Sequence, residues 1–341
     1  EVKMDPHIHT IECIIPPHMN KKIAENGSPE QREKALKAIT SSARLRAERA
    51  VIAEMTEWVR PTAVDGKQRY VFTANNGSNL PGTMARTEGD PPTGDLAVDE
   101  AYDGSGATYD LFKQTYDRDS IDGNGMRLDS TVHYQVGYDN AFWNGRQMVY
   151  GDGDEDLPEP QRLFNRFTIA LDVIGHELTH GVTQFEAGLV YRDQPGALNE
   201  SFSDVFGSLV KQRLRNQTPA EADWIIGEGL FTPNVNGLGI RSMKAPGTAY
   251  DDPVLGRDPQ PAHMSDYKNV DYDNGGVHIN SGIPNHAFYA TAMELGGFAW
   301  EKAGRIWYLT LRDRLSSTSI FTQAAQHTYL VAASLFGSGS L

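Results

Sequence analysis

His176-Glu177-Leu178-Thr179-His180 is the stretch from which the fold and chemistry of this chain can be worked out. In an α-helix, residues four apart lie one turn above each other on the same face, so the two imidazoles can reach one zinc ion. The glutamate beside the first histidine points toward the open side of such a metal. The alternative is a helix that carries two surface histidines and no metal.

A third metal ligand follows in the next polar stretch. A catalytic zinc usually takes three protein ligands and leaves one position for water. Glu200 is the candidate, and Asp204, four residues later, shares its helix face. Asp204 and Asn199 could accept hydrogen bonds from the remaining ring nitrogens of the two histidines. Residues 197–204 alone would suit an ordinary amphipathic helix equally well.

Composition excludes several classes of protein. The chain has 341 residues and a formal net charge of −14, which argues against nucleic acid as a partner. Its single cysteine, Cys13, rules out an intrachain disulfide and a thiolate-rich zinc site. No apolar run approaches the roughly 18 residues that span a membrane, and the first 30 residues lack a signal-peptide core. We therefore expect no membrane partner and a metal held by histidine and carboxylate.

The first 55 residues are expected to form a separate leader. Ser28 is suited to cap a helix, Pro29 to take its first position and Gln31 to close a capping box, so a helix is predicted from 29 into the fifties. From about 56 to 160, short β-branched and aromatic runs predict antiparallel strands, including 69–73 and 132–136. The Gly- and Asp-rich clusters DGNG (122–125) and GDGDED (151–156) are expected turns, and one helix is expected near 94–117.

Helical patterns dominate after residue 160. An apolar stripe leads into the metal-binding stretch, and a second helix is predicted near 197–214. Three further helical stretches are predicted at 283–295, 299–315 and 320–336.

Several short motifs stand in the order of one known family. They are NAFW at 140–143, GHELTHGVTQ at 175–184, GLVY at 188–191, GALNESFSD at 196–204, RSM at 241–243 and DNGGVHINSG at 273–282. From about residue 70 to its C-terminus the chain resembles the thermolysin-like zinc metallopeptidases. The resemblance implies an α+β fold with a β-rich catalytic domain at 56–190, which ends in the metal-binding helix, and a mostly helical domain at 191–341. The metal helix would lie at the cleft between them.

The resemblance also implies an activity, a zinc-dependent endopeptidase that acts on polypeptides as a monomer. One catalytic zinc would be bound by His176, His180 and Glu200, and Glu177 would activate its water. The oxyanion would be stabilised by Tyr191 and His278, the latter oriented by Asp273. The substrate backbone would be held by Asn140, Ala141 and Arg241.

A specificity pocket is implied by the same resemblance. Its lining would be Phe164, Phe167, Val173, Ile226 and Ile240. All five are apolar, so cleavage is expected before Leu, Ile, Val or Phe. Taken singly, each would more readily be core.

The chain departs from the family at a paired calcium site. Asp172, Asp223 and Glu228 fall on ligand positions, but Lys211 and Ile225 occupy two others. A protonated lysine has no lone pair for a cation, so one calcium at most is expected here.

The leader resembles that of the short-propeptide, protealysin-like branch, with Pro16-Pro17 near its start. We expect residues 1–55 to be a propeptide lying over the active-site cleft of a zymogen. Cys13 is a candidate zinc ligand that would displace the catalytic water, the alternative being a packed thiol. The family implies secretion. A catalytically silent zinc-binding adhesion or inhibitory module is the alternative function, and its simplest signature would be loss of Glu177 or His278; both are present.

Overall fold

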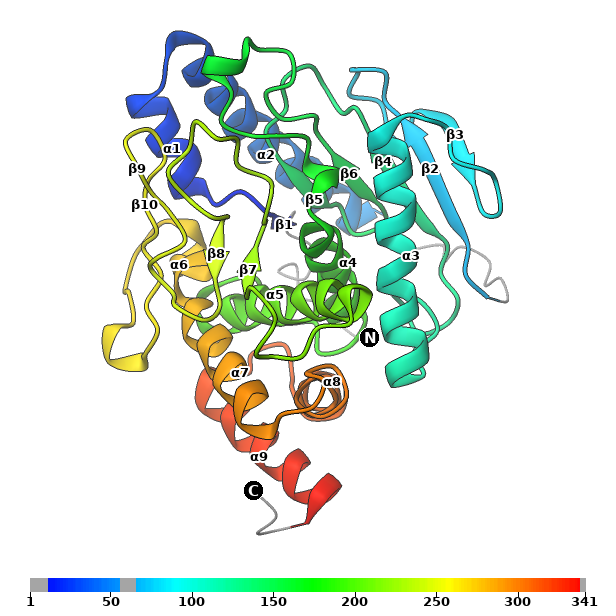
Figure 1. Ribbon diagram of the computed structural model, residues 1–341, viewed down its shortest axis with the longest axis vertical. Coiled ribbons are helices and arrows are strands. Elements are labelled where there is room, and N and C mark those ends of the chain that lie inside the picture. The colour runs from blue at the N-terminus through cyan, green and yellow to red at the C-terminus, as the bar shows by residue number, and fades with distance from the viewer. Residues whose placement is uncertain (1–11, 56–65, 338–341) are drawn as a thin grey trace.

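The computed structural model describes residues 12–55 and 66–337 of the chain (Figure 1). The first 11 residues of the expected leader and the stretch 56–65, which follows its expected end, lie outside the described residues. The leader comprises β1 (Glu12–Cys13), α1 (Pro17–Asn26) and α2 (Pro29–Met55). The predicted capping box is present: Gln31 N donates to Ser28 Oγ at 3.3 Å and Ser28 N donates to Gln31 Oε1 at 2.7 Å.

A six-stranded mixed sheet follows, in the order β1-β5-β6-β4-β2-β3. Besides β1, its strands are β2 (Arg69–Thr73), β3 (Thr83–Thr87), β4 (Leu128–Val132), β5 (Ala141–Trp143) and β6 (Met148–Tyr150). Helix α3 (Leu96–Tyr116) lies between β3 and β4 in the chain. The expectation of a purely antiparallel sheet is wrong, because β4 runs parallel to both β2 and β6. Helix α3 carries the chain back across the sheet before β4, and such a crossover allows parallel pairing.

The predicted strand at 132–136 is also misplaced, since β4 ends where that strand was expected to begin. His133 and Gln135 have φ values of 54° and 57°, which an extended strand does not accommodate. The helix expected near 94–117 is confirmed as α3.

The sheet edge expected to hold substrate is covered by the leader. Strand β1 pairs antiparallel with β5, with Glu12 opposite Trp143 and Cys13 opposite Phe142 (Figure 1). A segment far away in sequence therefore lies along the strand that borders the metal helix.

The helical half begins with the metal-binding helix. Its elements are α4 (Leu171–Phe185), α5 (Asp193–Arg215), β7 (Ile225–Ile226), β8 (Arg241–Ser242), β9 (Asp251–Asp252), β10 (Gly256–Arg257), α6 (Asp273–Asn280), α7 (Gly282–Leu295), α8 (Ala303–Asp313) and α9 (Phe321–Phe336). The predicted helices at 197–214, 283–295, 299–315 and 320–336 are confirmed within a few residues at most ends, so the α+β prediction holds.

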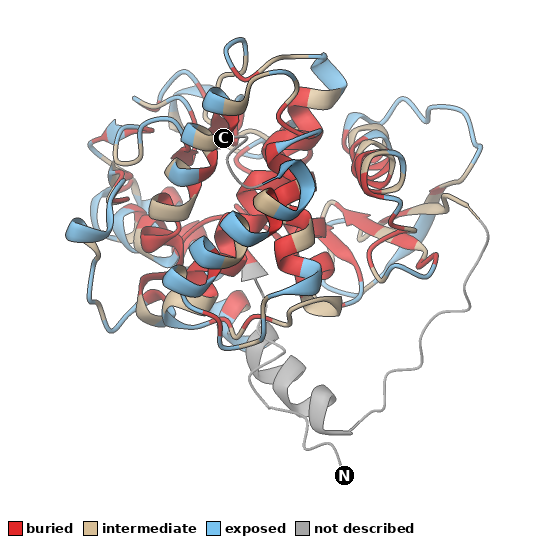
Figure 2. Ribbon diagram, turned by 90° about the horizontal axis from the view of Figure 1, so that it is seen from below, coloured by how far each residue is buried: buried red, intermediate tan, exposed pale blue. Residues whose placement is uncertain are grey.

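Helices α4 and α5 cross at unusually short range because two glycines meet there. A Cβ on Gly175 would lie 2.9 Å from Gly207 Cα, and one on Gly207 would lie 2.4 Å from the Asp172 carbonyl oxygen. No larger residue fits at either position. The close crossing turns Glu200 toward the two histidines of α4. Figure 2 shows buried residues concentrated in the central helices, with exposed residues on the outer ones. Among the described residues, no helix combines the length and apolar character needed to cross a bilayer.

Candidate metal centre and catalytic site

Three side chains converge between α4 and α5. The ligand atoms of His176, His180 and Glu200 all lie within 4.8 Å of one another, and the three residues are buried. The two Nε2 atoms are 2.9 Å apart. Glu200 Oε2 lies 3.6 Å from His176 Nε2, and Glu200 Oε1 lies 3.4 Å from His180 Nε2.

The hydrogen bonds behind the imidazoles fix which nitrogens face the centre. His176 Nδ1 lies 2.8 Å from Asp204 Oδ1, and His180 Nδ1 lies 2.8 Å from Asn199 Oδ1, so each Nδ1 carries a proton and donates it. Burial and the neighbouring His180 lower the pKa of His176, which favours the neutral ring.

Two neutral rings of this tautomer direct their Nε2 lone pairs at each other. A cation bound to both nitrogens would remove the repulsion between these lone pairs. Glu200 Oε2 is also buried without a hydrogen-bond partner among the described residues. Two imidazole nitrogens and one carboxylate form the donor set of a catalytic zinc site with an open position. The residues therefore fit zinc.

The candidate base stands beside this centre. Glu177 is fully buried on α4, and its Oε2 accepts a hydrogen bond from the Trp143 backbone N–H at 2.9 Å. The sequence did not single out this N–H, since any residue at the position would supply it. Strand β5 therefore fixes the rotamer of Glu177 as well as bordering the cleft.

The predicted oxyanion donors meet on the other side of the metal ligands. Tyr191 OH donates to Glu200 Oε1 and lies 3.1 Å from His278 Nε2. Asp273 Oδ1 lies 2.6 Å from His278 Nδ1, and Asp273 Oδ2 accepts the His278 backbone N–H at 3.0 Å. Burial lowers the pKa of His278, but the charges of Asp273 and Glu200 outweigh it and raise that pKa above its ordinary value. His278 is thereby held as a hydrogen-bond donor at Nε2.

Asp204 connects the metal ligands to Arg241. Arg241 Nε and Nη2 donate to the two Asp204 oxygens at 2.8 and 2.7 Å, a bidentate pair. Asn285 Nδ2 also donates to Asp204 Oδ2, at 2.8 Å. Burial raises the pKa of Asp204, but Arg241 and His176 hold it well below its ordinary range. Asn285 was missed in the sequence, because nothing in its helix separates it from other buried polar residues.

The leader runs through this site as an extended backbone. Ile14 N donates to the Ala141 carbonyl at 3.1 Å, and Ile15 N donates to Asn140 Oδ1 at 3.0 Å. Arg241 Nη1 donates to the Ile14 carbonyl at 3.4 Å. The Cys13 carbonyl lies 3.1 Å from His278 Nε2. Every group expected to hold a substrate backbone thus contacts the leader.

Cys13 was a candidate zinc ligand with a packed thiol as the alternative, and the structure shows the packed thiol. Its Sγ lies 3.7 Å from Ser42 Oγ, and the residue packs with Tyr134, Tyr138 and Phe142. Among the described residues, the potential metal-binding group does not include it. Neighbouring side chains of a strand point to opposite faces, so the Cys13 side chain joins this cluster while that of Ile14 joins the main one. The Cys13 carbonyl faces His278.

The five apolar residues predicted to line a specificity pocket share one hydrophobic cluster with Ile14. Phe164, Phe167, Val173, Ile226 and Ile240 are all buried, as is Ile14 itself. The ring centroids of Phe164 and Phe167 are 5.9 Å apart.

Lys211 lies among the three carboxylates predicted to bind calcium. Its Nζ is 2.7 Å from Asp172 Oδ2, 2.8 Å from Asp223 Oδ1 and 3.8 Å from Glu228 Oε2. It also donates to the Ile225 carbonyl at 2.7 Å. Burial lowers the pKa of Lys211, but the charges of Asp172 and Asp223 outweigh it, so the pKa is raised and the ammonium stays charged.

Comparison with known families and proteins gives consistent matches. Residues 54–184 match the family described as "Thermolysin metallopeptidase, catalytic domain", and residues 187–341 match "Thermolysin metallopeptidase, alpha-helical domain". An "Extracellular metalloprotease" of Pectobacterium carotovorum subsp. carotovorum is 51% identical over 324 residues, covering 95% of this chain and 91% of the relative. "Protease PrtS" of Photorhabdus sp. (strain Az29) is 47% identical, covering 95% of this chain and 87% of the relative.

A solved structure shares the complete fold. The precursor of protealysin, a metalloproteinase from Serratia proteamaculans, superposes with a TM-score of 0.86 at 51% identity. The match covers 96% of this chain and 95% of that one. The leader is therefore included in the likeness.

Proposed function

This chain belongs to the thermolysin family of metallopeptidases and is a zinc metalloendopeptidase, and we propose that it is a precursor whose own leader occupies the substrate cleft. The observation that carries the proposal is the register of the leader. Along the leader, the Cys13 carbonyl contacts His278, the Ile14 N–H and carbonyl contact Ala141 and Arg241, and the Ile15 N–H contacts Asn140.

We assign the catalytic roles from the same geometry. Zinc bound by His176, His180 and Glu200 would lower the pKa of a water molecule and polarise the scissile carbonyl. Glu177, held by the Trp143 N–H, accepts the proton of the attacking water and delivers it to the leaving amine.

His278 and Tyr191 donate hydrogen bonds to the oxyanion that develops on the scissile carbonyl. Asp273 keeps His278 oriented and protonated, as the 2.6 Å contact and the raised pKa of that imidazole support. Because Tyr191 also contacts Glu200, it links the oxyanion site to the zinc ligands.

The leader imitates a substrate whose scissile bond is Cys13–Ile14. The Cys13 carbonyl faces His278, where the oxyanion would form, and the next residue directs its side chain into the apolar cluster. A cavity of about 70 Å³ lies beside these residues, lined in part by Cys13, Tyr191 and His278. The leader thus excludes polypeptide substrates for as long as it stays in place.

Specificity follows from the residue that occupies the apolar pocket. Ile14 belongs to the same hydrophobic cluster as Phe164, Phe167, Val173, Ile226 and Ile240, which offer no charged group to a guest side chain. We therefore propose cleavage before Ile, Leu, Val or Phe, since burying a charged side chain there would leave it unpaired.

We further propose that the precursor needs no calcium at Asp172, Asp223 and Glu228. The Lys211 ammonium already supplies positive charge between these carboxylates, and Arg215 Nη1 adds a contact of 2.8 Å to Glu228. The expectation of at most one calcium in this site thus becomes a proposal of none.

The proposed division is a leader at 1–55 followed by catalytic domains at 56–190 and 191–341. The description of the Pectobacterium relative as an extracellular metalloprotease supports secretion of this chain as well.

The test is intact-mass spectrometry of the zinc-loaded full chain beside its Glu177→Gln variant. We expect only the wild type to lose an N-terminal piece of about 50 residues and then to cleave peptides before hydrophobic residues. The assigned roles would be contradicted by a chain that does not process itself and that stays inactive after an added protease has removed its leader. Equal trimming of both chains would show that another protease performs the cut.

A further inference from the structure

A second contact between leader and enzyme lies away from the metal centre. Lys34 of α2 is buried, and its Nζ lies 3.0 Å from Asp154 Oδ1 and 3.4 Å from the Gly153 carbonyl oxygen. The same ammonium also donates to Asp156 Oδ1. Asp154 and Asp156 belong to the GDGDED stretch at 151–156, which plays no part in the proposed catalysis.

The oxygen atoms of this pocket are held in place by the catalytic part of the chain. Asp154 Oδ2 accepts the backbone N–H groups of Leu163 and Phe164 at 2.7 and 3.0 Å, which leaves Oδ1 directed at the Lys34 ammonium. Asp154 itself is only 1% exposed. Its orientation therefore does not depend on the leader.

A third carboxyl group, that of Asp139, interacts with the Lys34 ammonium and has one oxygen that accepts no hydrogen bond from the described residues. Asp139 is 5% exposed, and its Oδ1 has no hydrogen-bond partner among the residues that the structure describes. Burial and the charge of Asp154 raise the pKa of Asp139 well above its ordinary value. Burial lowers the pKa of Lys34, but the charges of Asp139 and Asp154 outweigh it and raise that pKa. The unpartnered Oδ1 therefore leaves a buried oxygen acceptor open beside the Lys34 ammonium.

The wall of the pocket is kept open by Gly137. A Cβ at this residue would lie 2.6 Å from Lys34 Cε, 3.0 Å from Lys34 Nζ and 3.1 Å from Asp156 Oδ2. The φ of 59° is one that residues with a side chain rarely adopt. A side chain here would occupy the space that the ammonium fills.

We propose that Asp139, Asp154, Asp156 and the Gly153 carbonyl form a calcium site of the mature enzyme, which Lys34 fills in the precursor. The inference rests on the proposed removal of the leader, which takes Lys34 away and leaves these carboxylates uncompensated. Carboxylates with a backbone carbonyl are the hard oxygen donors that Ca²⁺ prefers. Asp154 and Asp156 supply two carboxylate groups for a divalent ion, and Asp156 is exposed enough to admit the ion from solvent. Lys211 differs, because it belongs to the catalytic part of the chain and stays in its site after maturation.

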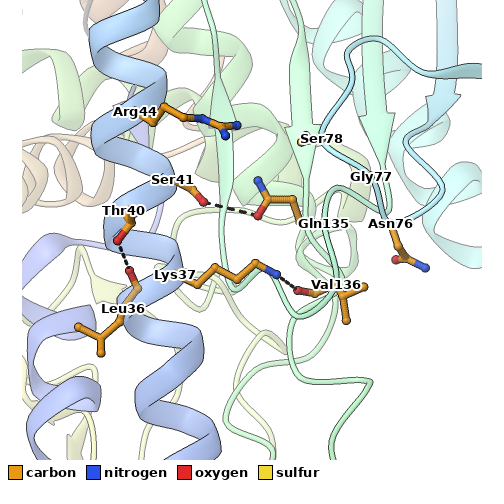
Figure 3. A pocket seen from close by; sticks show the side chains of 10 residues that line it. All are labelled: Leu36, Lys37, Thr40, Ser41, Arg44, Asn76, Gly77, Ser78, Gln135 and Val136. Carbon is orange, nitrogen blue, oxygen red and sulfur yellow. Dashed lines mark hydrogen bonds between the residues drawn. The ribbon is translucent and has the colours of Figure 1, made fainter.

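The leader offers a matched control one turn along the same helix. Lys37 Nζ donates to the Val136 carbonyl at 2.6 Å, beside a cavity of about 590 Å³ between α2 and the catalytic part (Figure 3). Figure 3 also shows Ser41 bonded to Gln135 on the same face of α2. Replacing Lys37 removes a leader lysine and its contact while Lys34 remains in the pocket.

The experiment opens the pocket without requiring maturation. Full-length zinc-loaded chains carrying Glu177→Gln, which prevents self-processing, are compared with and without Lys34→Ala, and Ca²⁺ binding is measured by isothermal titration calorimetry. We expect Lys34→Ala to bind one more Ca²⁺ per chain than the parent, Lys37→Ala to bind no more than the parent, and Asp156→Asn added to Lys34→Ala to abolish the added site. Ca²⁺ should raise the unfolding temperature of the Lys34→Ala chain alone.

Equal Ca²⁺ stoichiometry in the Lys34→Ala and Lys37→Ala chains would overturn the proposal. If Lys34→Ala does not fold, the processed wild-type and processed Asp156→Asn enzymes replace the pair. The processed Asp156→Asn enzyme should then bind one Ca²⁺ fewer than the processed wild type, and equal stoichiometry would overturn the proposal too. Because the first comparison uses an inactive chain, its outcome is independent of whether the catalytic assignment is correct.

Discussion

Replacing Ile14 by alanine should loosen the hold of the leader on the cleft. Ile14 is fully buried in the apolar cluster beside the metal centre, while its backbone contacts Ala141 and Arg241. Ile→Ala leaves these backbone contacts in place and removes three carbons from the pocket. At about 0.8 kcal/mol for each buried carbon, plus a cavity term, the loss is about 2–4 kcal/mol.

This loss of free energy can be measured through the apparent affinity of a ligand for the cleft. If a ligand binds only chains whose leader has left the site, its apparent Kd is divided by the fraction of open chains. A destabilisation of 2–4 kcal/mol therefore tightens apparent binding by about 30- to 900-fold. The ligand is a hydroxamate with a leucine side chain, titrated by calorimetry into zinc-loaded chains carrying Glu177→Gln.

The matched control is Leu36→Ala in the same leader. Leu36 is 56% exposed, so its truncation should leave the apparent Kd within about threefold of the parent. Circular dichroism checks that all three chains are folded. Equal hydroxamate affinity for the Ile14→Ala and Leu36→Ala chains would refute the idea that Ile14 fills the specificity pocket.

Three further perturbations test other parts of the molecule, each in the inactive full-length chain. The hydrogen bond to Asp152 raises the pKa of His133 from 6.5 to about 9 despite its partial burial, so its stabilisation is complete below pH 6.5 and is lost as pH rises through about 9. With the imidazole one-quarter exposed, His133→Gln should cost about 2 kcal/mol in urea unfolding at pH 6 and almost nothing at pH 10, and an equal cost at both values would count against the ion pair. Lys211→Met leaves the buried Asp172 carboxylate without its cation and should lower stability by about 3 kcal/mol, with recovery on adding Ca²⁺; a parent chain whose Tm already rises with Ca²⁺ would speak against Lys211 as the resident cation. Removing zinc with a chelator leaves the Nε2 lone pairs of His176 and His180 facing each other with no cation between them. The free energy of unfolding should fall by about 4 kcal/mol, whereas an unchanged Tm would argue against zinc at this centre.

The sequence by itself determined the metal-binding and catalytic chemistry of this chain. His176 and His180 stand four residues apart, and helical geometry alone places such residues on one face. Helix ends were equally local: the capping box of Ser28 and Gln31 formed because its hydrogen bonds join residues three apart. The order of the motifs added Tyr191, Arg241 and His278 as candidates, although no spacing rule could give the distances of these residues from the metal ligands.

Tertiary structure decided what depends on pairing between distant segments. The direction of β4 depends on the crossover through α3, which an alternating pattern does not encode. The sequence left open whether the Cys13 thiol ligates zinc or packs, and the register of β1 on β5 directs its carbonyl to the site and its sulfur away. No motif marks Lys34 among the lysines of the leader. Only the docking of α2 brings it to Asp154, because an ion pair across 120 residues exists only once both elements are packed.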